Sequence, residues 1–170
     1  AGWWDGNTDT GEDDPRSAAE DAATTAPFGR RWPGLAAAGD AAGPADDFAD
    51  EYAEFLADRR TRLGLVAAGR SADALAACGW TGPTNHVGDT GEISAVVRSW
   101  EDRFGVRVVG VGFDTLYLSV AAPPTSPEHA VQVAAEHVAF CPDLVWQGAG
   151  TLTAYAEEIR GMNCWSFWWD

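Results

Sequence analysis

Residues 106–120, VRVVGVGFDTLYLSV, form the stretch that decides the fold of this chain. Their β-branched and aromatic side chains predict two β-strands, joined by a tight turn at residues 112–114. Apolar and polar residues alternate in the second strand, which predicts one apolar face. The first strand is apolar at nearly every position, as is typical of a strand that is covered on both faces. The stretch therefore predicts a β-hairpin around which the other elements pack.

Several segments around this hairpin have the apolar period and the end signals of helices. They are 46–59; 71–78, with Ser71 as its cap and Gly79 as its stop; 89–104, with Asp89 as its cap and Gly105 as its stop; a helix from Ser126 that Pro142 ends; and a helix from Thr151.

Two further segments have the character of strands. RLGLVAA (62–68) is short and apolar, and the terminal NCWSFWWD (163–170) has an aromatic residue at nearly every position. From residue 62 onward the predicted order is strand, helix, strand, strand, helix, strand. This βαββαβ order predicts an α+β, ferredoxin-like fold, in which helices pack on one face of an antiparallel sheet.

The negative charge is concentrated near the N-terminus. The net charge is −15, and residues 1–58 hold 14 acidic residues and 3 arginines, a balance of −11. We expect 1–45 to be an acidic, Gly/Pro/Ala-rich linker or strap, or the end of an upstream domain, and 46–170 to be a single α+β domain. Such a charge also argues against nucleic acid as the partner, because phosphates require a positive surface.

The remaining composition argues for a cytoplasmic protein. No apolar run approaches the roughly 18 residues that a membrane span needs, and the first residues lack the regions of a signal peptide. The three cysteines, Cys78, Cys141 and Cys164, have no paired spacing, which favours a reducing compartment. We therefore expect a protein partner, either an upstream domain or a separate chain, and neither a membrane nor a cofactor.

Three blocks of sequence carry a family resemblance. They are SWEDRFGVRVVGVGFD (99–114), AEHVAFCPD (135–143) and WSFWWD (165–170). In their order and spacing they resemble the bacterial, actinobacterial-type family called domain of unknown function 4253, over roughly residues 32–170. Many members of that family carry an additional N-terminal region, which would leave Trp3 and Trp4 exposed in this chain. The resemblance implies a fold and a cytoplasmic location, but no catalytic residues.

The stretch EHVAFCPD (136–143) is the most site-like part of the sequence. If the helix continues, His137 and Cys141 share a face and could ligate a metal ion, or act as base and nucleophile. The acidic neighbours Glu136 and Asp143 disfavour a thiolate. The structural alternative is a small buried Cys141, with His137 interacting with the C-terminal end of the helix.

The loop 80–88 is a second candidate site. Its polar residues include Thr84, Asn85 and His86, and Asp89 follows at a helix N-terminus that could hold an anion. The structural alternative is that Asn85 makes a turn, Asp89 caps the helix and His86 is solvated. A pocket between this loop and the 136–143 corner would make the chain a small-molecule-binding protein or an enzyme.

The aromatic C-terminus favours a different function. Trp168 cannot face the same side of a strand as Trp165 and Phe167, so either both faces of the strand are covered, or Trp168 meets a partner, an upstream domain or the N-terminal strap. The structural alternative is that these aromatic rings close the core under residues 28–35. Because no catalytic constellation is complete, we expect a cytoplasmic protein-interaction or regulatory module with no chemistry of its own, such as an immunity-like protein for a basic partner. An exposed apolar patch at Trp168, or at Trp3 and Trp4, would favour this function. Convergence of His86 and His137 on one cleft would favour the enzyme.

Overall fold

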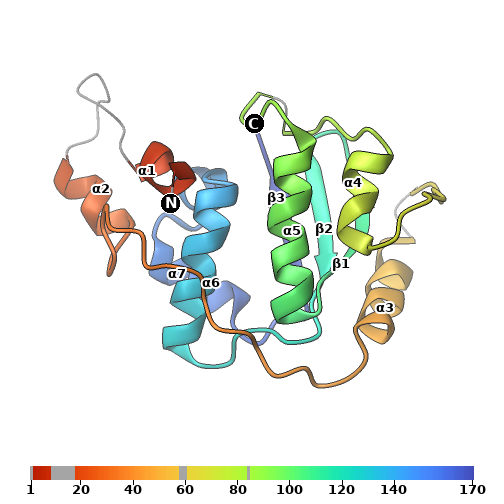
Figure 1. The fold of residues 1–170 in the computed structure, drawn as a ribbon. Helices are drawn as coiled ribbons and strands as arrows, with labels where there is room; N and C mark the ends of the chain where they lie inside the picture. Colours follow the sequence, from red (N-terminus) through yellow and green to blue (C-terminus); the bar gives the residue numbers. More distant parts are fainter. Residues whose placement is uncertain (1, 9–17, 58–60, 84) are drawn as a thin grey trace. The chain divides into compact units, whose positions relative to one another are not determined.

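The computed structural model describes four stretches of the chain: 2–8, 18–57, 61–83 and 85–170. Two compact units contain them. The first unit consists of Ala1–Ala37 and Pro124–Gly161, and the second of Ala38–Pro123 and Met162–Asp170. Figure 1 labels the helices and strands of both.

A three-stranded antiparallel sheet lies in the second unit, in the order β1–β2–β3. Its strands are β1 (Arg107–Val111), β2 (Thr115–Ser119) and β3 (Cys164–Trp168). The predicted hairpin is confirmed, because β1 pairs with β2 and the Gly112 N–H donates to the Thr115 carbonyl at 2.8 Å across the turn. The predicted terminal strand is confirmed as well, and its alternating residues Trp165 and Phe167 are buried.

The first strand is less covered than its sequence indicates. β1 is only half-buried, and Val111 at its end is 43% exposed. The cover of β1 is therefore only partial, and it is least at Val111 on this edge strand of the sheet. Its apolar residues reflect this partial burial rather than a central position.

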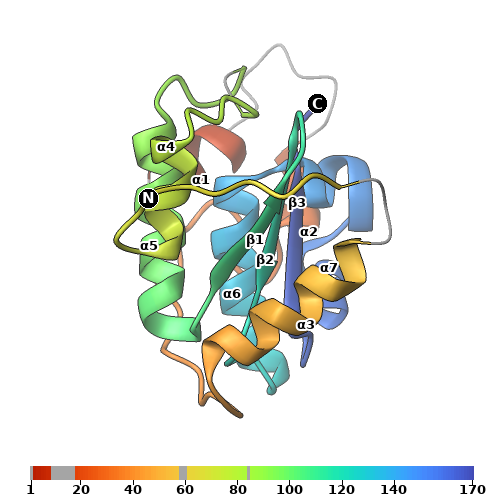
Figure 2. The ribbon, with the colours of Figure 1, turned by 90° about the vertical axis from the view of Figure 1, so that its right-hand side faces the viewer.

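Aromatic side chains join helix α5 (Thr90–Phe104) to one face of the sheet. The ring of Trp100 stacks on Phe167 at 5.3 Å and meets Trp165 edge-on at 5.7 Å. Figure 2 shows α5 on one side of the strands, with α3 (Ala45–Ala57) lying across them. Tyr117 of β2 meets Tyr52 of α3 at 6.4 Å, and in β2 it alternates with the residues that face α5. The sheet therefore has helical cover on both faces.

Both ends of α5 are as the sequence predicts. The Asp89 carboxylate accepts a hydrogen bond from the Gly91 N–H at 2.7 Å, and Gly105 ends the helix with a φ of 60°. Asp89 is thus the N-cap, and glycine suits the left-handed conformation that closes the helix.

Replacement of Asp89 by alanine is expected to lower the free energy of unfolding by about 1 kcal/mol, because the first turn of α5 loses an acceptor for its free N–H groups. Urea unfolding, followed by far-ultraviolet circular dichroism, measures this loss. Glu92→Ala is the matched control in the same turn and should cost less, since Glu92 is exposed and does not hold the cap position. Equal losses in the two variants would contradict a capping role for Asp89.

The predicted strand over 62–68 is wrong. Residues 61–69, which we call the arm, have no regular structure, and all nine are exposed. Within the described part of the chain, no backbone hydrogen bond joins residues 62–69 to another residue. The N–H of Val108, at the edge of β1, donates instead to Oγ of Ser71 at 2.7 Å.

The fold class is therefore confirmed as α+β, but the ferredoxin-like arrangement is not supported. Because the arm is not a strand, the sheet has three strands among the described residues. Ser71 is also not the cap of its helix, because it lies inside the 3-10 turn η1 (Ser71–Asp73), which leads into α4 (Ala74–Ala77). Gly79 follows with a φ of 68°, as predicted for the end of this segment.

The first unit is helical. Its elements are α1 (Gly2–Thr8), α2 (Ala18–Thr24), α6 (Pro127–Phe140), the π-helical turn η2 (Leu144–Ala149) and α7 (Leu152–Ile159). Ser126 caps α6 by accepting from the His129 N–H at 3.1 Å, and Thr151 caps α7 by accepting from the Ala154 N–H at 3.2 Å, as predicted. α6 and α7 pack against each other. None of the described helices is long and apolar enough to cross a bilayer.

Helices α1 and α2 lie within residues 1–45, which the sequence predicts to be a linker or strap. α1 packs on the end of α6, where Nδ2 of Asn7 donates to the Ala139 carbonyl at 3.0 Å and Trp3 meets the ring of Phe140. Trp4 is fully buried and contacts Trp32 at 5.7 Å. Trp4 thus packs inside the first unit, while the predicted domain boundary at residue 45 stays a prediction.

Candidate functional site

A buried polar cluster lies between α6 and α7 in the first unit. His137 of α6 has no exposed surface, and its Nδ1 lies 3.0 Å from the hydroxyl oxygen of Tyr155 in α7. Tyr155 is 6% exposed. The fully buried Cys141 follows α6, and its N–H donates to the His137 carbonyl at 2.7 Å. Three side chains that can take part in proton chemistry therefore lie close together.

Burial controls the chemistry of this cluster. It raises the pKa of Tyr155 well above its ordinary value, and negative charge on Cys141 and Glu158 would raise it further. The phenol consequently keeps its proton and can donate it to Nδ1 of His137. We interpret the pair as a hydrogen bond that satisfies two buried polar groups.

Alkaline pH is expected to destabilise the protein. Burial raises the pKa of Tyr155, and burial followed by negative charge on Cys164 and Tyr117 raises the pKa of Tyr52 to about 12. Above about pH 10 the unfolded chain releases tyrosine protons that the folded chain retains, so the free energy of unfolding falls as the pH rises. Below about pH 10 this contribution is fully present.

Urea unfolding at a series of pH values, with tyrosinate absorbance as a second observable, measures this loss. Tyr155→Phe should remove part of the alkaline loss. It should also lower stability at neutral pH by about 1–3 kcal/mol, because Nδ1 of His137 loses its partner. An alkaline profile that Tyr155→Phe leaves unchanged would contradict the retained proton.

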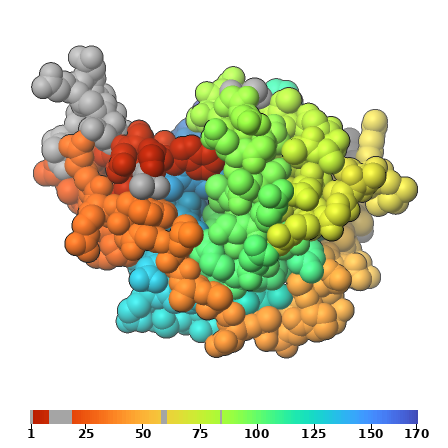
Figure 3. Space-filling view, viewed as in Figure 1, coloured from red at the N-terminus to blue at the C-terminus, as the bar shows by residue number. Residues whose placement is uncertain are grey.

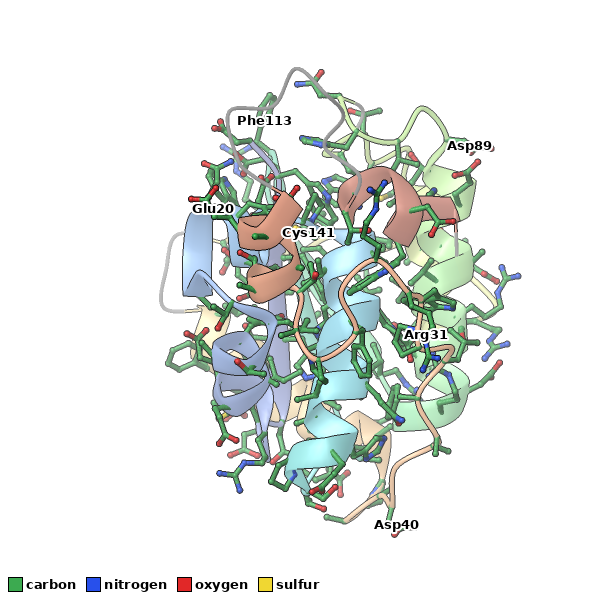
Figure 4. All side chains as sticks on the ribbon, turned by 90° about the vertical axis from the view of Figure 1, so that its left-hand side faces the viewer. Glu20, Arg31, Asp40, Asp89, Phe113 and Cys141 are labelled. Carbon is green, nitrogen blue, oxygen red and sulfur yellow. The ribbon has the colours of Figure 1, made fainter. Side chains whose placement is uncertain are left out.

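The metal and nucleophile predictions at 136–143 gain no support from this geometry. α6 ends at Phe140, and Cys141 has non-helical dihedral angles, so His137 and Cys141 do not share a helix face as the sequence analysis assumed. Across the described residues, no group of three or more His, Cys, Asp or Glu side chains is placed to hold a metal ion. Figure 4 shows Cys141 among the packed side chains at the end of α6.

The acidic neighbours of Cys141 have structural hydrogen bonds. Oε1 of the buried Glu136 accepts from the Ala36 N–H at 2.8 Å, and Oδ1 of Asp143 accepts from Nε2 of Gln147 at 2.9 Å. The two carboxylates therefore fix the segment at Ala36 and the side chain of Gln147. A catalytic role for His137, Cys141 and Asp143 stays a prediction.

The loop 80–88 is placed in the second unit. Asn85 and His86 are exposed, and Nε2 of His86 lies 2.9 Å from the carbonyl oxygen of Asp170. Asp89 caps α5 at the position that Figure 4 labels. Thr84 lies outside the described residues. Because this loop and the 136–143 corner belong to different units, the pocket predicted between them, and the convergence of His86 with His137, stay predictions.

Most large apolar side chains that the structure shows as exposed lie in the second unit. Leu63 and Leu65 in the arm are 93% and 94% exposed, and Phe113 at the hairpin tip is 92% exposed. Trp168, the predicted interaction residue of β3, is 39% exposed. The others in this unit are Phe55, Val66, Val111 and Met162. Figure 3 shows the arm (yellow) protruding from its surroundings, and Figure 4 shows Phe113 at the end of its hairpin.

Helix α3 adds negative charge to this apolar surface. Four exposed carboxylates lie at helical spacing on one face of α3, and we call them the acidic stripe: Asp47, Asp50, Glu51 and Glu54. Phe55 follows the stripe at 62% exposure and stacks on Tyr52 at 6.2 Å. No residue of α3 is fully buried. The helix therefore offers solvent a face that combines negative charge with an aromatic ring.

Sequence reasoning missed two features of these sites. It assigned Leu63 and Leu65 to a strand, although the flanking small residues Gly64, Ala67 and Ala68 offer little surface for burial. It also left His137 without its partner Tyr155, which comes from a different helix. The sequence of α3 does show four acidic residues at helical spacing. It does not show that this face of the helix lies in solvent.

The fold defines the class of this protein: an α+β chain with a three-stranded antiparallel sheet and helices on both of its faces. The chain belongs to the family described as Domain of unknown function (DUF4253), whose sequence model matches residues 62–170. The match begins within the arm and includes all three strands. Comparison with curated proteins found no match, and neither did comparison with solved structures.

Proposed function

We propose that this chain is a protein-interaction or regulatory module of the cytoplasm, without chemistry of its own. The observation that carries the proposal is the exposure of large apolar side chains on the second unit, above all Leu63, Leu65 and Phe113. Single exposed apolar residues are common on protein surfaces, but several on neighbouring elements favour a binding surface.

The arm and α3 are such neighbouring elements. Oγ1 of Thr61, the first residue of the arm, donates to the Leu56 carbonyl in the last turn of α3 at 3.2 Å. Leu56 in turn packs beside Gly110 in β1, where a Cβ added to the glycine would lie 3.6 Å from Cδ1 of Leu56. The exposed Leu63, Leu65 and Phe55 thus belong to segments that meet at one side of the sheet.

Site-specific photo-crosslinking in the cells that produce the protein tests this proposal. A photo-reactive amino acid in place of Leu65 should give a crosslinked species of defined mass. The matched control places the same amino acid at Glu128, which is exposed in the first unit, and should give none. Identical products from both positions, or none from Leu65, would contradict an interaction surface at the arm.

Native mass spectrometry before and after a metal chelator tests the alternative of a small-molecule binder or enzyme. The proposed module should show the bare mass of whole subunits under both conditions. A retained small molecule, or an added mass that chelation removes, would overturn the module and favour the alternative. The immunity-like role toward a basic partner stays a prediction.

A further inference from the structure

The arm is the most exposed apolar segment of the second unit. Every residue from 61 to 69 is exposed, and Leu63 and Leu65 keep almost their whole side-chain surface in water. Figure 2 shows the arm as a drawn-out trace between α3 and α4. Since the burial of leucine is favourable, an arm of this kind has a surface that a partner can cover.

The arm is also basic at its start. Arg62 lies within the arm, and Arg59 and Arg60 precede it in the sequence, so three of the eleven basic residues of the chain fall within four positions. The chain as a whole carries a net charge of −15. A basic, apolar segment in such an acidic chain requires an acidic, apolar surface as its complement.

The same chain provides that complement on α3. The acidic stripe is exposed, and among the described residues no ion pair involves any of its four carboxylates. Like charges three and four residues apart repel each other along a helix, so a basic partner would relieve this repulsion. Phe55 continues the stripe with an exposed ring, to which leucine side chains can pack.

We propose that two copies of this chain associate by exchanging arms, so that the arm of each copy lies along α3 of the other. Arg62 then meets the acidic stripe, and Leu63 and Leu65 cover Phe55. Within a single copy these leucines remain exposed, so the arm does not cover its own α3. The inference rests on the proposed function, since it names the partner of that same surface.

Two-fold symmetry follows from this arrangement. Because the two arms are exchanged reciprocally, the contact forms twice and closes the assembly at two chains. The net negative charge of each copy opposes association at long range, but physiological salt screens such repulsion beyond about 8 Å. Salt weakens the arm contacts as well, so salt dependence alone does not identify them.

Sedimentation equilibrium over a wide range of protein concentration measures the association. The unchanged chain should form a reversible dimer, and the double variant Leu63→Ser, Leu65→Ser should weaken it by about a hundredfold or more, because the apolar anchors are lost. Phe113→Ser is the matched control, since Phe113 is equally exposed but lies at the hairpin tip. It should leave the dimer unchanged.

A charge exchange gives the sharper test. Arg62→Glu places a negative charge against the acidic stripe, and Glu51→Arg places a positive charge against the arm. Each variant alone should dimerise about tenfold more weakly. Mixed together they should form a heterodimer, visible by native mass spectrometry, because both arm contacts then pair opposite charges. Matching far-ultraviolet spectra establish that all variants are folded.

Three results would overturn the arm exchange: a monomer at every concentration, a dimer that survives the double leucine variant, or no preference for the mixed dimer. A bare monomer that still gives a crosslink to another protein at Leu65 would overturn the arm exchange and leave the interaction module standing. A retained small molecule in the native mass spectrum would overturn the module itself.

Discussion

Replacement of Trp100 by alanine is expected to lower the free energy of unfolding by about 3–5 kcal/mol, and it is one of the two largest effects that the structure predicts. Trp100 has no exposed surface and packs its ring against Trp165 and Phe167 of β3. Alanine would leave a cavity between α5 and the sheet, and the surrounding rings can close it only in part. Such a loss is a large share of the stability of a protein of this size.

Urea unfolding followed by circular dichroism measures the loss, and Trp168→Ala is the matched control in the same unit. Trp168 is 39% exposed and lies on the other side of β3 from Trp165 and Phe167. Its removal should therefore cost much less than the removal of Trp100. Similar losses for the two tryptophans would contradict the assignment of Trp100 to the core.

Replacement of Trp4 by alanine is the second large effect, again about 3–5 kcal/mol if the first unit unfolds as a whole. Trp4 is fully buried beside Trp32, and its indole N–H has no hydrogen-bond partner among the described residues. Trp4→Phe keeps an aromatic ring in the site and removes this buried, unsatisfied donor. It should consequently cost far less than alanine.

Chemical denaturation of both Trp4 variants distinguishes burial from an interaction role of this residue. The alanine variant should unfold at a clearly lower urea concentration than the phenylalanine variant. If instead both variants keep the full stability of the chain, Trp4 does not contribute to the core, and its predicted role in binding a partner gains support.

Local signals in the sequence predicted most of the second unit. The hairpin, the capped helix α5 and the alternating terminal strand follow from β-propensity, from Asp89 and Gly105, and from the period of two in the last residues. These signals act over a few residues, so they survive any arrangement of the rest of the chain. The same holds for Ser126 and Thr151, which cap α6 and α7.

The errors arose where tertiary contacts decide the outcome. Residues 62–68 have the composition of a strand, but a strand needs a free edge to pair with, and Oγ of Ser71 accepts from the edge N–H of Val108. Likewise, the short helices α1 and α2 have little period of their own, and α1 packs on α6 through Trp3 and Asn7. No local pattern contains such distant partners.

The candidate site shows the same limit. Spacing placed His137 and Cys141 four residues apart, yet the helix ends between them and the partner of His137 comes from another helix. Composition identified the acidity near the N-terminus, but the exposure of the acidic stripe and of the arm depends on which residues the sheet covers. That information lies in the packing and not in the period of the sequence.

The order of the elements along the chain affects how this protein folds during its synthesis on the ribosome. The second unit begins near Ala38 but takes β3 from Cys164–Trp168, after the α6–α7 segment of the first unit. A nascent chain therefore carries an unfinished two-stranded hairpin, which is marginally stable in water, while α6 and α7 are already synthesised. Throughout that interval, Leu116 and Leu118 lack their pairing partners in β3, Phe167 and Trp165. Until β3 has emerged, the apolar face of the hairpin lacks its partner strand, and exposed apolar surface of this kind favours aggregation.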